Sequence, residues 1–179
     1  MRDKSIYILP LGNISLDFVE KLKSNLEEIF GFKIKLTNKR EIPDYAYNKE
    51  KDKHNGRIIL NELAKVNFEN CEKILAITNE DLFIEDLSHI FGQAELSGKV
   101  CLFSINRLNP EFYKEESNKN LFYDRILKEA IHELGHTFSL KHCQNKKCVM
   151  CFSNNIEEVD IKKSEFCEDC EKMYKYMNF

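Results

Sequence analysis

The chain has 179 residues, of which 42% are hydrophobic and 32% are charged, and its formal net charge is −3 at pH 7. This composition predicts a water-soluble protein with one compact domain, which we expect to be a monomer, and it gives no reason to expect nucleic-acid binding. No apolar run reaches the ~20 residues that a membrane-spanning helix needs. The start, MRDKSIYILPLG, lacks the cleavage site of a signal peptide. We therefore expect a cytoplasmic protein with reduced thiols and no membrane partner.

The first third of the chain alternates strand and helix patterns. Residues 5–11 are apolar and partly β-branched, which predicts a buried strand. Apolar residues recur at helical spacing from Ser15, a candidate N-cap, to Gly31, a candidate stop signal. Residues 32–36 alternate between apolar and charged and predict a half-exposed strand. The order strand, helix, strand predicts a parallel pair joined by a right-handed crossover.

The middle of the chain predicts fewer elements. Residues 38–54 are charged and predict a long loop, and residues 55–66 predict a second helix. Residues 73–78 predict a third strand, which an acidic connecting loop at 79–87 follows.

Two further strands precede the longest helix. Residues 88–94 and 99–106 predict strands, and Gly92 within the first indicates a bulge or the close approach of another backbone. His89 is expected to be an ordinary surface or capped residue. After a polar connection at 107–119, a long helix is predicted by apolar residues at every fourth position: Phe122, Ile126, Ala130 and Leu134. The whole pattern predicts a mixed α/β fold of roughly five strands and three or four helices, with a twisted sheet packed on helices.

The predicted long helix ends in an HExxH motif. His132 and His136 are four residues apart, so they share one helical face and can bind one metal ion. Glu133 can reach a water on that metal without binding the metal itself. His142 lies too far along for the same face, so the helix must end near residues 139–140 and the chain must turn back under the metal. Three imidazoles with one open coordination position are typical of a catalytic zinc site.

Cysteines dominate the C-terminal segment, which holds five of the seven in the chain. The 37 residues after His142 are too few for a core of their own, so a bound metal would supply folding energy there. Four thiolates in C-x4-C and C-x2-C pairs can bind a structural zinc: Cys143, Cys148, Cys167 and Cys170. Two disulfides or buried thiols are the alternatives, and Cys151 could replace one ligand.

Together these residues resemble the metzincin zinc peptidases, whose long motif is HExxHxxGxxH followed by a methionine turn. The match is closest to the archaemetzincin branch, in which CxxxxCxM and a later CxxC follow the third histidine. The resemblance implies a metzincin-like fold in which Met150 lies beneath the three histidines, although a methionine that merely fills a gap in the core is the alternative. It also implies that an edge strand binds an extended substrate peptide above the zinc. Its residues are Phe91, Gly92, Gln93, Ala94 and Glu95.

The chain departs from the family pattern at Ser139, where the family has glycine. A helix often ends on a residue with positive φ, which costs a non-glycine residue about 1–2 kcal/mol. Either Ser139 adopts this conformation or the turn is formed differently. The spacing from Met150 to the CxxC pair is also one residue shorter than in the family. The resemblance further implies one catalytic domain with two parts: residues 1–142 with the active-site helix, and residues 143–179 with the methionine turn and the cysteine zinc site.

These observations predict a zinc metallopeptidase that takes a peptide or protein substrate and holds two zinc ions, one catalytic and one structural. Zinc on the three histidines would lower the pKa of its bound water to about 7, and Glu133 would accept the proton and pass it to the leaving amine. Candidates for a second donor to the oxyanion are Arg107, Tyr113 and Tyr123. Two alternatives stay open: a non-catalytic zinc module for peptide binding or assembly, and a hydrolase of non-peptide amides.

Overall fold

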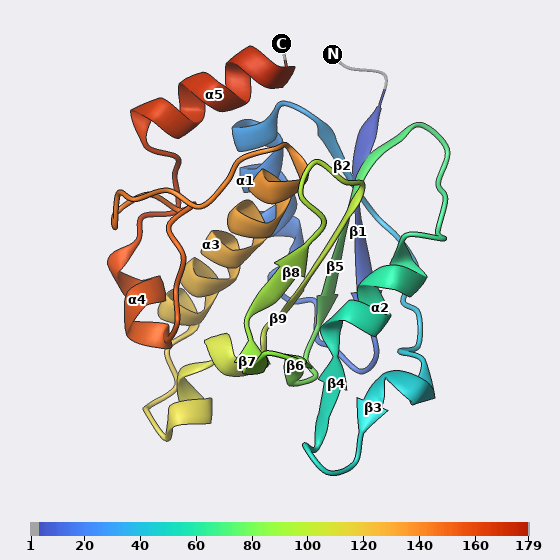
Figure 1. Cartoon of the computed structure of the whole chain (residues 1–179). Coiled ribbons are helices and arrows are strands. Elements are labelled where there is room, and N and C mark those ends of the chain that lie inside the picture. The colour runs from blue at the N-terminus through green and yellow to red at the C-terminus, as the bar shows by residue number, and fades with distance from the viewer. Residues whose placement is uncertain (1–3, 179) are drawn as a thin grey trace.

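A five-stranded mixed sheet crosses the middle of the molecule in the computed structural model, which describes residues 4–178 (Figure 1). Its strands, in spatial order, are β2 (Lys33–Leu36), β1 (Ser5–Leu11), β5 (Cys71–Thr78), β9 (Val100–Ser104) and β8 (Gly92–Ala94). The first four are mutually parallel, and β8 runs antiparallel to β9 at the edge of the sheet. The fold is therefore mixed α/β, as predicted.

Helices cover both faces of this sheet. Two of them, α1 (Val19–Phe30) and α3 (Lys119–Thr137), pack on one face, and α2 (Gly56–Leu63) packs on the other. The sheet therefore separates two apolar clusters. Side chains of α1 and α3 pack against strand residues on one face, such as Leu75, and side chains of α2 pack against strand residues on the other face, such as Ile74. This alternation follows from the two-residue period of a strand.

The predicted helix that starts at Ser15 begins later, at Val19, so the Ser15 cap is wrong. The backbone N–H of Val19 donates to the carbonyl of Leu16 in a turn, and the apolar side chains before the helix pack on the core instead of extending the helix. The predicted stop is confirmed: Gly31 adopts φ 68°, and its N–H donates to the Glu27 carbonyl. Glycine adopts this left-handed conformation at little cost.

A second, four-stranded sheet occupies regions that were predicted as loops. Its strands are β3 (Tyr47–Asn48), β4 (Lys53–Asn55), β6 (Leu82–Ile84) and β7 (Leu87–Ile90), in that order. The predictions of loops at 38–54 and 79–87 are therefore wrong. Strands of two to four residues carry too little alternation to recognise, and β4 pairs with β6 from a distant part of the chain.

The strand predicted at 88–94 is divided at Phe91. Residues before Phe91 pair with β6 in the second sheet, whereas residues after it pair with β9 in the first sheet. The polar connection predicted at 107–119 contains two 3-10 turns, at Asn106–Leu108 and Pro110–Tyr113. The helix predicted at 55–66 corresponds to α2, and a further helix, α5 (Glu168–Asn178), follows near the C-terminus.

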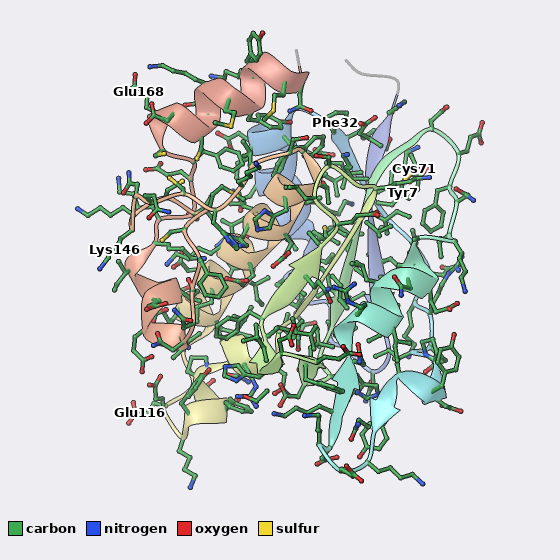
Figure 2. All side chains as sticks on the ribbon, viewed as in Figure 1. Tyr7, Phe32, Cys71, Glu116, Lys146 and Glu168 are labelled. Atoms are coloured by element: carbon green, nitrogen blue, oxygen red, sulfur yellow. The ribbon has the colours of Figure 1, made fainter. Side chains whose placement is uncertain are left out.

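The C-terminal segment, which includes α5 and a short unpredicted helix α4 (Ile156–Ile161), packs against α3. Its buried side chains join the apolar cluster of α1 and α3, and the hydroxyl of Tyr174 donates to the carbonyl of Phe30 at 2.7 Å. The ring of Phe138, at the end of α3, lies 5.4–5.5 Å from the rings of Phe30, Phe32 and Tyr174. Figure 2 shows Phe32 in the interior, with Glu116, Lys146 and Glu168 at the periphery. Within residues 4–178, no helix is long and apolar enough to cross a membrane.

Candidate active site

The three predicted zinc-binding histidines converge at the C-terminal end of α3. The Nε2 atoms of His132 and His136 lie 3.1 Å apart, close to the roughly 3.3 Å expected for two nitrogens on one tetrahedral zinc with bonds of about 2.0–2.1 Å. His142 comes from the turn after the helix, and one ring nitrogen of each histidine lies within 4.8 Å of the others. The group therefore fits a single zinc ion.

Backbone carbonyls orient two of these rings. The Nδ1 atom of His132 lies 2.8 Å from the carbonyl oxygen of Val149, and Nδ1 of His136 lies 2.7 Å from that of Leu140. A carbonyl oxygen only accepts hydrogen bonds, so each Nδ1 donates and each Nε2 keeps its lone pair for a metal. Burial lowers the pKa of all three histidines, and the nearby charge of Lys162 lowers each further. The neutral, metal-binding form is therefore favoured.

The turn that brings His142 back beneath the helix centres on Ser139. This residue adopts φ 72°, so of the two predicted possibilities the strained one is correct. Its N–H donates to the His136 carbonyl, and the N–H of Leu140 donates to the carbonyl of Gly135. These two bonds satisfy carbonyls that the end of a helix leaves unpaired.

Glu133 is almost completely buried, and its Oε2 atom has no hydrogen-bond partner within residues 4–178. Its carboxylate lies against the backbone of Gly92, where a Cβ atom would be 2.5 Å from Glu133 Oε1. The closest neighbour of Gly92 is therefore the Glu133 side chain and not the backbone that the sequence predicted. Burial raises the pKa of Glu133, Glu129 raises it further, and Lys162 opposes this.

A cavity of about 320 Å³ joins the histidines to Glu133. Strands β7 and β8 form one wall, α3 forms the floor, and residues 152–154 with Lys162 form the opposite side. His89 lines this cavity, so it is closer to the site than an ordinary surface residue would be. At the base, Lys162 Nζ lies 3.5 Å from Glu129 Oε1, and both side chains are at most 4% exposed.

The predicted peptide-binding strand forms part of the wall. Of its five residues, four line the cavity: Phe91, Gly92, Gln93 and Ala94. Glu95 does not line it, because its side chain folds back over Gly98 at the tip of the β8–β9 hairpin. The strand is the antiparallel edge of its sheet, so one side of its backbone has no neighbouring strand among residues 4–178.

Met150 is fully buried directly against α3. A Cβ atom on Gly135 would overlap Met150 Sδ, so the helix can approach the methionine only because residue 135 is glycine. Gly135 lies between His132 and His136 in the sequence, which places the thioether beneath the histidine cluster.

The four predicted cysteine ligands also converge, with their Sγ atoms all within 4.8 Å of one another. Cys143 Sγ and Cys167 Sγ lie 3.7 Å apart, near the roughly 3.8 Å expected for two thiolates on a tetrahedral zinc and far from a disulfide bond of about 2.05 Å. Backbone N–H groups of Asn145 and Cys167 donate to sulfurs of the cluster. Cys151 lies outside this group, and none of the cysteines in residues 4–178 forms a disulfide.

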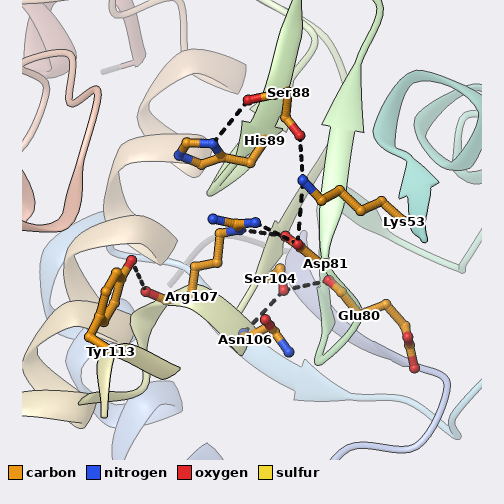
Figure 3. A network of polar contacts seen from close by, with 9 residues as sticks. All are labelled: Lys53, Glu80, Asp81, Ser88, His89, Ser104, Asn106, Arg107 and Tyr113. Carbon is orange, nitrogen blue, oxygen red and sulfur yellow. Dashed lines mark hydrogen bonds and ion pairs between the residues drawn. The ribbon is translucent and has the colours of Figure 1, made fainter. Parts of the chain in front are cut away.

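The three residues suggested as oxyanion donors are engaged elsewhere. Figure 3 shows Arg107 Nε and Nη2 on the two carboxylate oxygens of Asp81, at 2.6 and 2.7 Å, and the Tyr113 hydroxyl on the Arg107 carbonyl. The Tyr123 hydroxyl donates to an asparagine on α1. None of the three lines the cavity. The Asp81 network instead supports strand β7, since Lys53 Nζ reaches both Asp81 and the Ser88 carbonyl.

Comparison with known proteins agrees with this arrangement. The sequence profile described as Peptidase family M54 matches residues 13–176. The archaemetzincin of Methanocaldococcus jannaschii is 42% identical over 167 residues, which cover 93% of this chain and 90% of the relative. The chain belongs to peptidase family M54, the archaemetzincins. Membership places it among the zinc metallopeptidases and confirms the resemblance seen in the sequence.

Solved archaemetzincin structures share the whole fold. The 1.5 Å crystal structure of the Methanopyrus kandleri protein superposes with a TM-score of 0.86 at 31% identity, covering 98% of this chain and 96% of that one. The Archaeoglobus fulgidus protein, crystallised with malonate, gives 0.82 at 32% identity, covering 94% and 99%. The metzincin-like fold is therefore shown for this family member.

Two charged residues of this archaemetzincin site were missed in the sequence. Glu129 lies four residues before Glu133, so helical spacing alone could have placed it on the same face. Lys162 belongs to no motif, and its place at the cavity depends on how the segment after Met150 folds back. Ser153 was also missed; its buried Oγ has no partner among the described residues.

Proposed function

We propose that this chain hydrolyses peptide bonds with a zinc ion held by His132, His136 and His142, and that Glu133 is the proton acceptor. The observation that carries the proposal is the unpartnered Oε2 atom of a buried carboxylate beside three converging imidazoles. A closed structural site has no use for such an atom. A general base needs it, because the oxygen must be available to the proton that it takes.

Each residue has a defined part in the reaction. Zinc, when bound, supplies a Lewis acid that acidifies water and polarises a substrate carbonyl. Glu133 Oε2 takes the proton of the attacking water and returns it to the amine that leaves. Val149 and Leu140 hold two imidazoles in the tautomer that presents Nε2. The close fit of Gly92 against Glu133 keeps the carboxylate from turning away from the cavity.

The edge strand β8 would bind the substrate backbone. An extended peptide can add to an open sheet edge through main-chain hydrogen bonds, with alternate side chains directed into pockets. Because Gly92 faces Glu133, a peptide beside β8 would pass directly over the carboxylate. The cavity of about 320 Å³ would receive a side chain next to the bond that is cut.

The cysteine cluster would hold a second, structural zinc. Its four sulfurs lie within 4.8 Å of one another, and four thiolates can complete a closed tetrahedral zinc site. The segment has few buried residues, so zinc would fix the turn that contains Met150. We propose two zinc ions per chain, with separate roles.

The test compares wild type with Glu133→Gln and His136→Ala. Native mass spectrometry should find two zinc ions in wild type and Glu133→Gln, and one in His136→Ala. Cleavage of a mixed peptide library should fall by about 10²–10⁴-fold in Glu133→Gln, because the base is lost while the metal remains. Equal cleavage by Glu133→Gln and wild type would exclude the proposed role. A zinc-loaded wild type that cleaves nothing would favour a non-catalytic peptide-binding module.

A further inference from the structure

Lys73, on the central strand β5, is largely buried, with 9% of its surface exposed. Its Nζ atom donates to the Gly98 carbonyl at 2.8 Å and to the Thr137 carbonyl at 2.9 Å. The same nitrogen lies 4.8 Å from the centre of the Phe138 ring. Burying a lysine is costly unless its donors are satisfied, and here two carbonyls and an aromatic face surround it.

The two carbonyls belong to different parts of the active site. Thr137 is the last residue of α3, and Gly98 lies in the tip of the β8–β9 hairpin. The tip is fastened to the helix end by two more contacts: the N–H of Ser97 donates to the His136 carbonyl at 3.0 Å, and Ser139 Oγ donates to Ser97 Oγ at 2.9 Å. A cation at a helix C-terminus also interacts favourably with the helix dipole.

The contact between the β8–β9 hairpin tip and the end of α3 forms a junction. The residues next to this junction set the geometry of the histidine cluster. Ser139 is held at φ 72°, a strained conformation for serine, and the carbonyl of Leu140 orients His136. Two residues later the chain supplies His142. On the other side of the junction, the hairpin carries the edge strand, whose far end touches Glu133 through Gly92. This junction therefore connects the turn between His136 and His142 to β8, the strand proposed to bind substrate.

We propose that Lys73 is a positioning residue, which clamps the β8–β9 hairpin tip to the end of α3 and thereby holds the His136–His142 turn in its metal-binding form. The inference rests on the proposed zinc site. Elsewhere in the family a glycine adopts the left-handed conformation at this turn without strain. Here Ser139 occupies the position, and Lys73, which lies outside the motif, stabilises the turn instead.

The first test measures zinc affinity by chelator competition in wild type, Lys73→Met and Lys73→Arg. Methionine keeps the length of the side chain and removes the donors, so the histidine site should bind zinc at least about tenfold more weakly, as when partners that orient metal ligands are removed. Arginine, which keeps the charge, should restore most of the affinity. His136→Ala reports the cysteine cluster alone and serves as the internal reference. Leu63→Ala, on the opposite face of the sheet, is the matched control for a general loss of stability.

Equal losses in Lys73→Met and Leu63→Ala, or unchanged zinc affinity in Lys73→Met, would overturn the proposal. Ser139→Gly provides a second test that does not depend on how well Lys73→Met folds. If Lys73 holds the strained turn, glycine at 139 should recover zinc affinity in the Lys73→Met background more than it changes wild type; additive effects would contradict the clamp. Both tests read metal binding, so they remain decisive even if the protein cleaves no peptide.

Discussion

The two candidate metal sites differ in what holds their ligands in place. His132 and His136 lie on a 19-residue helix whose buried face packs against the sheet, and carbonyl groups fix their rings. Three of the four clustered cysteines lie on irregular segments and Cys170 lies in the first turn of α5, while Cys143 and Cys167 are half-buried. The packed helix and the carbonyl groups thus hold the histidines in place, whereas we expect the cysteine cluster to depend more on a bound metal for its order. A catalytic site needs ligands that are held in place as the histidines are, whereas a structural metal site can be ordered by the metal itself.

The largest effect should come from removing a ligand of the cysteine cluster. Cys148→Ser should weaken zinc binding at a buried position, and without the metal the segment that contains Met150 should lose one of its constraints. We expect fast amide exchange across residues 143–178 and a large fall in melting temperature. His136→Ala, which removes a ligand from the other site, should keep slow exchange in α3. If the two variants lost protection from amide exchange to a similar extent, the proposed difference between the sites would be wrong.

A smaller and more local effect is expected from Gly92→Ala. The added Cβ would lie 2.5 Å from Glu133 Oε1, so the carboxylate must move within a packed helix. Peptide cleavage should fall by about 10²-fold, the effect typical of a misplaced catalytic group, while zinc content and melting temperature stay near those of wild type. Full peptide cleavage by Gly92→Ala would show that the Glu133 carboxylate can move aside without loss of function, despite its close packing.

The smallest effect is a pH dependence of the zinc-free protein. Burial lowers the pKa of His132, so the unfolded state binds more protons than the folded state once the pH falls below about 6.5. Stability should therefore be full above this value and decrease as the pH falls toward the lowered pKa. Urea midpoints measured between pH 5 and 8 should show this slope, and His132→Asn should flatten it. An unchanged slope in the variant would assign the effect to other groups.

The sequence was informative where short-range periodicity or a fixed spacing carries the structure. The helix that presents His132 and His136 follows from its own residues, and so do strands β1 and β2, whose predicted parallel pairing is confirmed. The second sheet was missed because its strands are short and pair across distant segments. The sequence predicted a strand at 73–78 and no role for Lys73, since only the packed structure shows the two carbonyls that it joins. Tertiary contacts of this kind leave no mark in local sequence.

Three consecutive residues serve both metal sites at once. Cys148 belongs to the sulfur cluster, the carbonyl of Val149 orients His132, and Met150 lies under the helix that carries the histidines. If zinc binds at both sites, ordering this tripeptide at one of them should lower the entropic cost of ordering it at the other, and by thermodynamic reciprocity the two zinc affinities should rise together. When zinc is scarce, we expect molecules that carry a single ion to be rarer than two independent sites would give.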